Sequence, residues 1–518
     1  MLWFARVQDV DSEWFVNLGD FIGRNARRHG DRTAIVDGER SVSFREFDER
    51  SNRLGRWMLE AGLATGDRVA IFLSNRLEFF DAAFGLPKAG LVSIYLSHRL
   101  TSAELGYQLA DSGASALIVS DDLASVVEGA DLAGVTVVMQ TGSEYEDNLA
   151  AMSGERLCVE LAPNAPLSIV YTSGTSGRPK GAIQSHENWY WYTIGHLIHI
   201  GMRPDDRVLV AGPLVFSGRG HSYSALFRGA TQVVLRKFDA AATLAAIQEH
   251  KITATTLVPT MIYMLLELIE TDDADLSSLR RIIYGGAPMA PDRLQQCLDR
   301  FGPIFTQSYG LTEVTGGATY LERDEHVAGA PQIASAGRAA FGMECAIVDG
   351  TGQHLPPDAV GEICLRGPNV FTGYLNNEEL TAERFDDGWF HTGDIGRLDD
   401  NGYLYILDRK SDMIISGGHN VYPREVEDVL LSHAAVAEAA VVSVPDPTWG
   451  EAVTAVVRLR AGSTTTSDAL IAHCRGPLAG YKVPKTVLLS PIELPRNTNG
   501  KLLRRTLRDE LTSSGSGA

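Results

Sequence analysis

The segment that most constrains the fold is the glycine- and hydroxyl-rich stretch 171–181, which reads YTSGTSGRPKG. An apolar run over 167–171 predicts a buried strand before it, and the residues GAIQ at 181–184 predict a second strand after it. The stretch is not a Walker loop, because a proline precedes its lysine, a glycine follows it, and no hydroxyl residue comes next. We therefore expect a loop that connects two strands.

The residue types in this loop suit an anionic ligand. Glycines let several backbone N–H groups point at one anion, and the hydroxyl and lysine side chains add donors and a positive charge. A flexible Gly/Ser linker is the alternative, but the preceding strand and the Pro-Lys-Gly ending favour phosphate binding. The candidate ligand-binding residues are Thr172, Ser173, Gly174, Thr175, Ser176, Gly177 and Lys180.

The length and charge of the chain limit its class. Its 518 residues exceed the roughly 250–300 at which one core stops growing, which predicts two or more domains. A formal net charge of −19 argues against a nucleic-acid partner, and no apolar run approaches the length of a membrane span. Five scattered cysteines without a C-x-x-C motif, and an N-terminus unlike a signal peptide, predict a cytoplasmic location.

The order of predicted elements indicates an α/β protein. Residues 1–165 and 182–330 alternate short apolar strands with helical patterns, including a helix expected at 51–64, and this alternation predicts largely parallel sheets flanked by helices. Residues 331–408 are denser in strands and glycine turns, which predicts a β-rich subdomain. A boundary is expected near 408–412, before a new helix and strand.

A second candidate element for nucleotide binding reads QSYGLTE at residues 307–313. The aromatic ring of Tyr309 beside Gly310 offers a stacking face for a base, and Thr312 offers a hydroxyl to a phosphate. The carboxylate of Glu313 is a ligand of the kind that Mg²⁺ prefers. Taken alone, the stretch is equally compatible with an ordinary strand-turn-helix.

Together these stretches resemble the adenylate-forming (AMP-binding) superfamily, in particular its acyl- and aryl-CoA synthetases, from about residue 20 to 507. The resemblance implies a large N-terminal domain over 1–408, a hinge at 409–411 and a small mobile α+β domain over 412–518. It implies a hinge residue at Ser411, where relatives usually carry aspartate or lysine.

The resemblance also assigns roles around the nucleotide. It implies that Asp394 binds the ribose hydroxyls, that Arg409 contacts ribose and phosphate, and that Lys501 is the adenylation lysine. The resemblance implies that Lys501, Thr312 and Glu313 are catalytic residues and that Glu313 is also the metal ligand. Further residues implied at the nucleotide are Gly286, Ala287, Pro288, Gln307, Ser308, Tyr309 and Gly310.

The sequence gives the least information about the acyl pocket, and the CoA site is likewise inferred only from the resemblance. The resemblance implies an acyl pocket near Tyr192, Phe216 and Gly285, and contact of coenzyme A with Gly417 and Gly418. No aspartate of the kind that holds the α-amine of an amino acid is found near residue 216, which favours a simple carboxylic acid. For Arg219 and His221, solvent-facing or structural roles are favoured over contact with a second polar group of the substrate.

The implied activity is that of an ATP-dependent carboxylate–CoA ligase. The enzyme would use ATP, Mg²⁺ and coenzyme A, act on a small carboxylic acid through an acyl-adenylate, and be compatible with a homodimer. Two alternatives remain at this point: an enzyme that loads the phosphopantetheine of a separate carrier protein, and a non-catalytic nucleotide- or acyl-binding protein.

Overall fold

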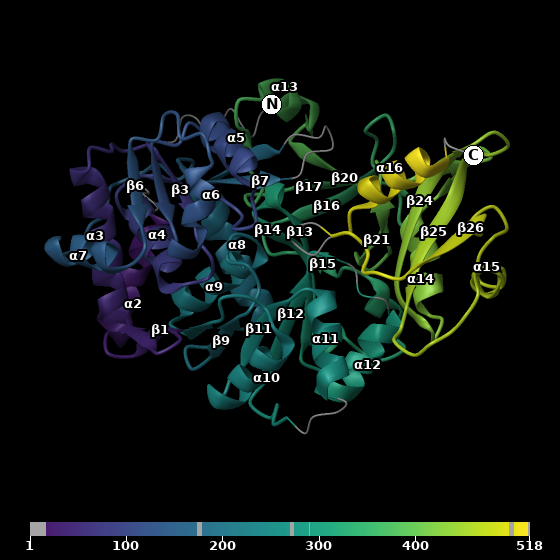
Figure 1. The fold of residues 1–518 in the computed structure, drawn as a ribbon, viewed down its shortest axis with the longest axis horizontal. Coiled ribbons are helices and arrows are strands. Elements are labelled where there is room, and N and C mark those ends of the chain that lie inside the picture. Colours follow the sequence, from purple (N-terminus) through teal and green to yellow (C-terminus); the bar gives the residue numbers. More distant parts are fainter. Residues whose placement is uncertain are drawn as a thin grey trace.

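The computed structural model describes residues 17–172, 179–269, 274–287, 289, 291–496 and 502–515. Their strands form four sheets, and the first three belong to the part of the chain up to Arg409. The fourth sheet belongs to the described residues from 410 onward, here called the C-terminal part, which lies to one side of the rest in Figure 1. The structure confirms the predicted α/β class with a β-rich subdomain and a small α+β C-terminal part.

The first sheet has nine strands in the order β15-β14-β13-β12-β11-β9-β10-β1-β2. Its centre, from β13 to β1, is parallel, and its outer pairs are antiparallel. The strands are β1 (Thr33–Asp37), β2 (Arg40–Ser43), β9 (Arg207–Val210), β10 (Thr231–Val234), β11 (Ala254–Leu257), β12 (Arg281–Gly285), β13 (Phe305–Leu311), β14 (Gly316–Leu321) and β15 (Arg338–Ala339).

The second sheet has seven strands in the order β18-β8-β7-β4-β3-β5-β6. Strands β7 and β8 are an antiparallel pair in which Thr172 lies opposite Lys180, so the predicted loop does connect two strands. The strands are β3 (Arg68–Phe72), β4 (Val92–Tyr95), β5 (Ala116–Val119), β6 (Val137–Gln140), β7 (Pro166–Thr172), β8 (Lys180–Ser185) and β18 (Gly373–Tyr374).

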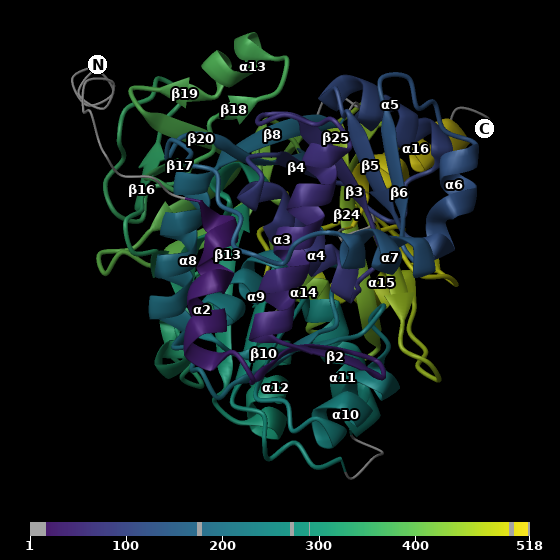
Figure 2. The same cartoon turned by 90° about the vertical axis from the view of Figure 1, so that its left-hand side faces the viewer.

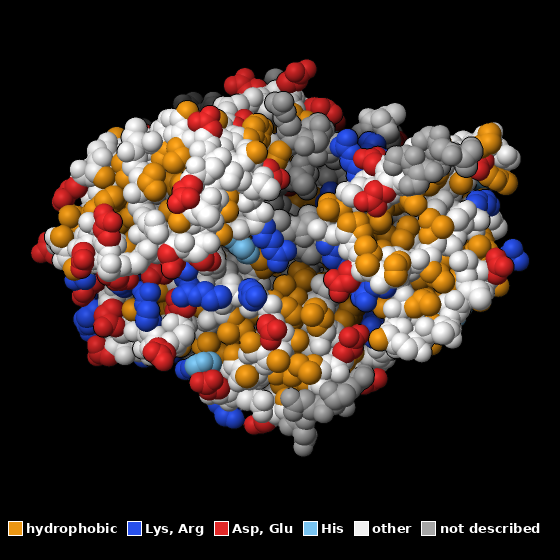
Figure 3. Space-filling model, in the orientation of Figure 1, with side chains coloured by type: hydrophobic (Ala, Val, Ile, Leu, Met, Phe, Trp, Pro, Cys, Tyr) orange, Lys and Arg blue, Asp and Glu red, His pale blue; other side chains and the backbone are white. Residues whose placement is uncertain are grey.

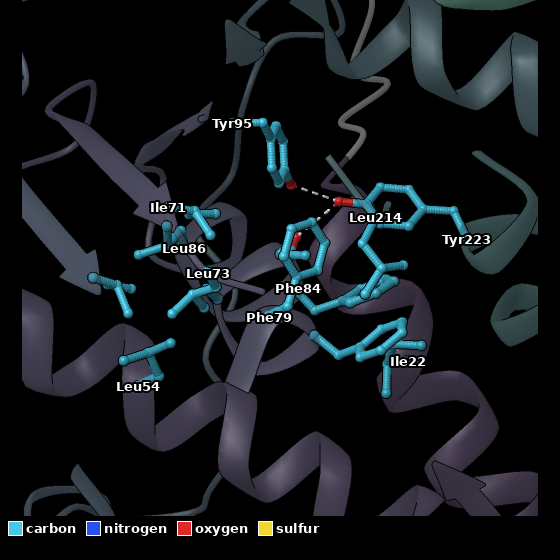
Figure 4. Packing of buried hydrophobic residues seen from close by; sticks show 14 of the residues in the cluster. Ile22, Leu54, Ile71, Leu73, Phe79, Phe84, Leu86, Tyr95, Leu214 and Tyr223 are labelled. Carbon is cyan, nitrogen blue, oxygen red and sulfur yellow. Dashed lines mark hydrogen bonds between the residues drawn. The ribbon is translucent and has the colours of Figure 1, made fainter. Parts of the chain in front are cut away.

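Helices pack between and around these two sheets, as Figures 1 and 2 show. One apolar cluster joins strand residues of the first sheet, such as Ile35, to those of the second, such as Ile71. In its interior the hydroxyls of Tyr95 and Tyr223 are 2.8 Å apart (Figure 4). The α-helices of this part are α2 (Phe21–His29), α3 (Phe44–Glu60), α4 (Leu77–Lys88), α5 (Ser102–Ser112), α6 (Ala124–Glu128), α7 (Ser143–Ala151), α8 (His186–Ile200), α9 (Ser217–Arg228), α10 (Ala240–Glu249), α11 (Pro259–Ile269), α12 (Pro291–Phe301) and α13 (Glu378–Glu383).

Helix α3 begins and ends earlier than the helix predicted at 51–64, since it runs over Phe44–Glu60. The Ser43 hydroxyl accepts a hydrogen bond from the Glu46 N–H at 3.2 Å, and the Glu46 carboxylate accepts one from the Ser43 N–H at 2.7 Å. This capping box satisfies two N–H groups that have no partner within the helix, and it therefore sets the first turn at Phe44. The expected start was wrong because the pattern of apolar residues alone does not report such a cap.

The last two sheets are smaller. The third, predicted as the β-rich subdomain, contains β16 (Glu344–Val348), β17 (Gly361–Arg366), β19 (Phe385–Asp386), β20 (Trp389–Leu398) and β21 (Leu404–Arg409), all antiparallel. The fourth contains β22 (Ile414–Ser416), β23 (His419–Val421), β24 (Val436–Asp446), β25 (Gly450–Leu459) and β26 (Thr486–Ser490), packed with α14 (Pro423–Leu431), α15 (Ser467–Cys474) and α16 (Arg504–Gly515). Within the described ranges, no helix is both long and apolar enough to cross a bilayer.

Candidate active site

A cavity of about 1090 Å³ opens where the first three sheets meet the C-terminal part. Figure 3 shows the surface hollowed between the two parts. Segments far apart in the sequence line this cavity together, as expected for a site assembled by the fold. The predicted site residues on its wall are Thr172, Lys180, Tyr192, Phe216, Gly285, Gly286, Ser308, Gly310, Thr312, Glu313, Asp394, Arg409 and Ser411.

Several predicted residues do not take part in this wall as the structure describes it. Residues 173–177, Pro288 and Lys501 lie outside the described residues. Ala287, Gln307 and Tyr309 are described but are not among the lining residues, and neither are Gly417 and Gly418. The predicted phosphate loop is therefore represented on the described wall by its two ends, Thr172 and Lys180.

Tyr374, which was not among the predicted site residues, joins the phosphate loop to the second motif. Its hydroxyl donates a hydrogen bond to the Glu313 carboxylate at 2.9 Å, and its ring centroid lies 5.8 Å from the Lys180 ammonium. Burial and the neighbouring Arg384 lower the pKa of Lys180 below its usual value. Tyr374 reaches this position because β18 pairs with β8, a long-range pairing that no local pattern announces.

The second motif is held in a narrow backbone turn. Gly310, the residue before the last of β13, lies so close to β14 that a Cβ atom there would be 1.4 Å from the Gly316 carbonyl oxygen. Thr312 and Glu313 then open a short 3₁₀ turn (Thr312–Val314), and both line the cavity. Glycine at 310 is thus required by the close approach of two strands.

Tyr309 makes a contact with Asp394 that the sequence did not predict. Its hydroxyl donates a hydrogen bond of 2.7 Å to the Asp394 carboxylate. Burial, and then the charge of Asp394, hold the pKa of Tyr309 well above its usual value. Tyr309 therefore orients Asp394, whose other oxygen lies 3.4 Å from the Arg409 Nε across the β20–β21 pair.

The other end of the cavity is aromatic and buried. Tyr192 and Phe216 line it as predicted, and Gly220 and Gly316 approach the Tyr192 side chain so closely that a Cβ at either would lie within 2.6 Å of one of its atoms. Trp189 and His196 also line this end, and both lie within four residues of Tyr192, near which the acyl pocket was expected. Both come from α8 near the Tyr192 position, so spacing along that helix was the available signal.

Arg219 and His221 also line this aromatic end, so the solvent-facing alternative was wrong for both. Both residues lie on α9, and only 4% of the surface of Arg219 and 2% of that of His221 is exposed. Burial lowers the pKa of His221 to about 4 and that of His196 well below its usual value, so both imidazoles are neutral near pH 7. The two rings are linked by a 3.3 Å hydrogen bond.

The C-terminal part meets the cavity through two segments. Lys410 and Ser411 line it next to the last strand of the third sheet, and Arg496 lines it from the opposite end of the C-terminal part. The turn that carries Gly417 and Gly418 connects β22 to β23, where the Gly417 N–H donates to the Trp449 carbonyl at 2.8 Å. Among the described residues of the C-terminal part, Lys410, Ser411 and Arg496 line the cavity, and Gly417 and Gly418 do not.

Comparisons with known proteins agree with this arrangement. The family of AMP-binding enzymes matches residues 22–375, and the C-terminal domain of the same enzymes matches residues 425–501. A feruloyl-CoA synthase from Amycolatopsis sp. is 38% identical over 95% of this chain and 98% of its own length. A 2-succinylbenzoate–CoA ligase from Geobacillus sp. (strain WCH70) is 36% identical over 94% of this chain and 96% of its own.

Solved structures give the same result. The o-succinylbenzoate CoA synthetase of Bacillus subtilis, in complex with its acyl-adenylate intermediate, superposes with a TM-score of 0.85 at 33% identity, over 95% of this chain and 98% of its own. An anthranilate CoA ligase in complex with anthranoyl-AMP superposes with a TM-score of 0.91 at 25% identity, over 98% and 99%. The resemblance to adenylate-forming enzymes is therefore confirmed, and the chain belongs to the AMP-binding enzyme family.

Proposed function

We propose that this protein is an AMP-forming carboxylate–CoA ligase, which adenylates a carboxylic acid with ATP and then transfers the acyl group to coenzyme A. The observation that carries the proposal is that Thr172, Lys180, Thr312, Glu313 and Asp394 line one cavity although they come from three distant segments. The names of the relatives support it, because they are CoA synthetases and CoA ligases that cover nearly the whole chain.

In the first half-reaction the substrate carboxylate attacks the α-phosphorus of ATP, and pyrophosphate leaves. We assign the triphosphate to the 172–180 loop and Thr312, where hydroxyl, backbone N–H and ammonium groups can bind the charge that moves to the leaving group. We assign the ribose to Asp394, whose carboxylate can accept hydrogen bonds from two hydroxyl groups. We assign the adenine base to Gly286, Ala287, Pro288 and residues 307–310. Lys501 is assigned to the reacting carboxylate and α-phosphate.

A magnesium ion fits this proposal at Glu313. Its carboxylate lines the cavity beside the phosphate loop, and Mg²⁺ prefers carboxylate and phosphate oxygens. When bound there, the ion would offset negative charge on the phosphates. The Tyr374 hydroxyl, which hydrogen-bonds to one Glu313 oxygen, fixes the orientation of the carboxylate.

We further propose that residues 1–408 and 412–518 are two domains joined by a hinge at 409–411, with Ser411 as its pivot. The division is supported by the sheets, because β21 of the third sheet ends at Arg409 and β22 of the fourth begins at Ile414. Rotation about the hinge would withdraw the segment after Arg496 and bring Gly417 and Gly418 to the cavity. These glycines would then border the pantetheine of coenzyme A, a gating motion between two half-reactions.

The acid itself is assigned to the aromatic end of the cavity, formed by Tyr192, Phe216 and Gly285. Two alternatives remain distinguishable by experiment: transfer to a carrier protein, and binding without catalysis. The relatives' names favour free coenzyme A over both. A homodimer stays a prediction, which sedimentation velocity of the full chain would check.

The test is mass spectrometry of the purified protein incubated with ATP, Mg²⁺ and coenzyme A against a panel of aliphatic, aromatic and dicarboxylic acids. Formation of an acyl-CoA together with AMP supports the proposal. Acyl-AMP without acyl-CoA would instead favour a carrier-loading enzyme. ATP binding without pyrophosphate release on any acid would favour the non-catalytic alternative.

A further inference from the structure

A buried cation that has no counter-ion among the described residues lies at the aromatic end of the cavity. The Arg219 guanidinium donates one hydrogen bond, from Nη2 to the side-chain oxygen Oε1 of Gln184 at 3.3 Å. Its Nε and Nη1 are buried and have no hydrogen-bond partner among the described residues, and no carboxylate in that part of the chain forms an ion pair with it. A charge taken out of water in this way is strongly unfavourable unless a partner neutralises it.

Two aromatic rings hold the guanidinium in place. Its central carbon lies 3.8 Å from the ring centroid of Tyr95 and 4.7 Å from that of Trp189. Tyr95 is fixed by its hydroxyl contact with Tyr223 (Figure 4), and Trp189 donates its indole N–H to Gln184 at 2.9 Å. Cation–π contacts offset part of the buried charge but satisfy none of its N–H donors, since those bonds lie in the guanidinium plane.

Two further residues of the cavity wall have buried polar atoms without partners. The Nε2 atom of His221 and the hydroxyl of Thr256 are both buried and have no hydrogen-bond partner among the described residues. Since buried polar groups are normally hydrogen-bonded, three exceptions on one cavity wall indicate that a ligand supplies the missing partners. The charge of Arg219 indicates that the ligand is an anion.

The position of Arg219 limits the size of that ligand. The Gln184 side chain accepts from Arg219 and, with its Nε2, donates to the Thr312 backbone carbonyl at 2.8 Å. A single amide group thus separates the buried cation from the residue assigned to the phosphates. A ligand that bridges Arg219 and the reacting carbon must therefore have a compact skeleton.

We propose that the acid activated by this enzyme carries a second carboxylate, which binds Arg219 and His221 while the first carboxylate is adenylated. This inference rests on the proposed function. A carboxylate matches the paired donors of a guanidinium and neutralises its charge, whereas a neutral phenol or an alkyl chain leaves the charge uncompensated. The substrate class is that of short or aromatic dicarboxylic acids.

The test compares acids that differ only in the second carboxylate. Pyrophosphate release and acyl-CoA formation are measured for butanedioic against butanoic acid and for benzene dicarboxylic acids against benzoic acid. We expect higher kcat/KM for at least one dicarboxylic acid, and a loss on the order of 100-fold for it in Arg219→Met. In the same variant, the ratio of kcat/KM for the dicarboxylic acid to kcat/KM for the matched monocarboxylic acid should fall toward one.

Arg228→Met is the matched control. Arg228 lies on the same helix, is exposed, and donates to the Met202 carbonyl at 3.2 Å away from the cavity. The control makes the same change of charge and should leave both rates as in the parent protein. Arg219→Lys should retain part of the preference, because it keeps the charge but not the paired donors.

Folding is checked through the melting temperature. Because Arg219 has no counter-ion in the described residues, Arg219→Met should melt at or above the temperature of the parent protein without ligand. A fall of several degrees, together with loss of activity on every acid, would show that Arg219 acts in folding and would overturn the inference.

Failure of this inference can be told from failure of the proposed function. If monocarboxylic or phenolic acids are preferred and Arg219→Met leaves that preference unchanged, the inference is wrong and the ligase assignment stands. If no acid is activated, titration calorimetry with the α,β-methylene analogue of ATP present decides. Binding of a dicarboxylic acid that is lost in Arg219→Met supports the inference alone, and no binding overturns it.

Discussion

The carboxylate of Asp408 accepts a hydrogen bond of 2.8 Å from the backbone N–H of Arg424. Asp408 lies on the last strand of the third sheet and Arg424 in the first turn of α14, so this bond joins the two parts of the molecule. The other carboxylate oxygen accepts from the Arg409 N–H at 2.8 Å, and the Arg504 guanidinium lies 3.9 Å away. The bond thus helps to hold the C-terminal part in the orientation in which Arg496 lines the cavity.

Asp408 should make the stability of this arrangement depend on pH. Burial raises the pKa of Asp408 to about 6, although Arg504 opposes the shift. Below a pH of about 4 the carboxyl is protonated in both the folded and the unfolded protein. As the pH rises toward about 6, the carboxyl ionises more readily in the unfolded protein than in the folded one. The free energy of unfolding therefore falls by up to about 3 kcal/mol, a loss that a protein with a neutral residue at this position does not show.

We therefore expect Asp408→Asn to melt at a higher temperature relative to the parent protein at pH 8 than at pH 5. The matched control is Asp275→Asn, because the pKa of Asp275 is lowered to about 2 by hydrogen bonds from Ser277, and its ionisation does not change in this range. A difference in melting temperature between Asp408→Asn and its parent that is equal at both pH values would contradict this prediction.

Asp394→Asn should weaken ATP binding. The substitution replaces a carboxylate that is positioned by Tyr309 and Arg409 and that we assign to the ribose. Charged hydrogen bonds are worth roughly 1.5–3 kcal/mol, so KM for ATP should rise roughly ten- to hundred-fold. Pyrophosphate release at varied ATP measures this. Tyr309→Phe removes only the orienting hydroxyl and should raise KM less; an equal or larger rise would mean that the Tyr309 hydroxyl itself contacts the nucleotide.

Lys501→Ala should separate the two half-reactions. Removing a cation that stabilises the transition state costs about 10²- to 10³-fold in rate, so acyl-AMP formation should fall by that factor. Thioester formation from supplied acyl-AMP should remain, because the variant still has the Gly417–Gly418 turn. The control Lys251→Ala removes a lysine paired with Asp275 at the surface. Normal acyl-AMP formation in Lys501→Ala would remove the catalytic assignment.

Gly310→Ala should disrupt the nucleotide motif. The added Cβ would lie 1.4 Å from the Gly316 carbonyl oxygen, so β13 and β14 would have to separate. We expect a loss of more than about 3 kcal/mol in the free energy of unfolding, seen as a lower melting temperature and lost pyrophosphate release. Gly480→Ala is the control, because a Cβ atom added at Gly480 would meet no heavy atom within 4 Å. A Gly310→Ala protein with unchanged melting would show that these strands can part at little cost.

Much of this molecule follows from local sequence. The order of apolar runs predicted alternating strands and helices, and the strands before and after the 171–181 loop were confirmed as β7 and β8. The loop and the 307–313 stretch pointed to the family, which the comparisons confirmed. Local patterns suffice here because the alternation of strands and helices and the chemistry of a glycine-rich loop depend on residues that are close together in the chain.

The tertiary structure alone decided which side chains meet. Tyr374 contacts Glu313 and Lys180 only because β18, a strand of two residues, pairs with β8. Arg219 and His221 are polar residues of a kind that sequence reasoning assigns to the surface, yet both are buried on α9, Arg219 against the Tyr95 ring and His221 against His196. Burial and long-range pairing arise when distant segments pack together. The neutral histidines, and a guanidinium with no counter-ion among the described residues, therefore follow from packing and not from any local pattern.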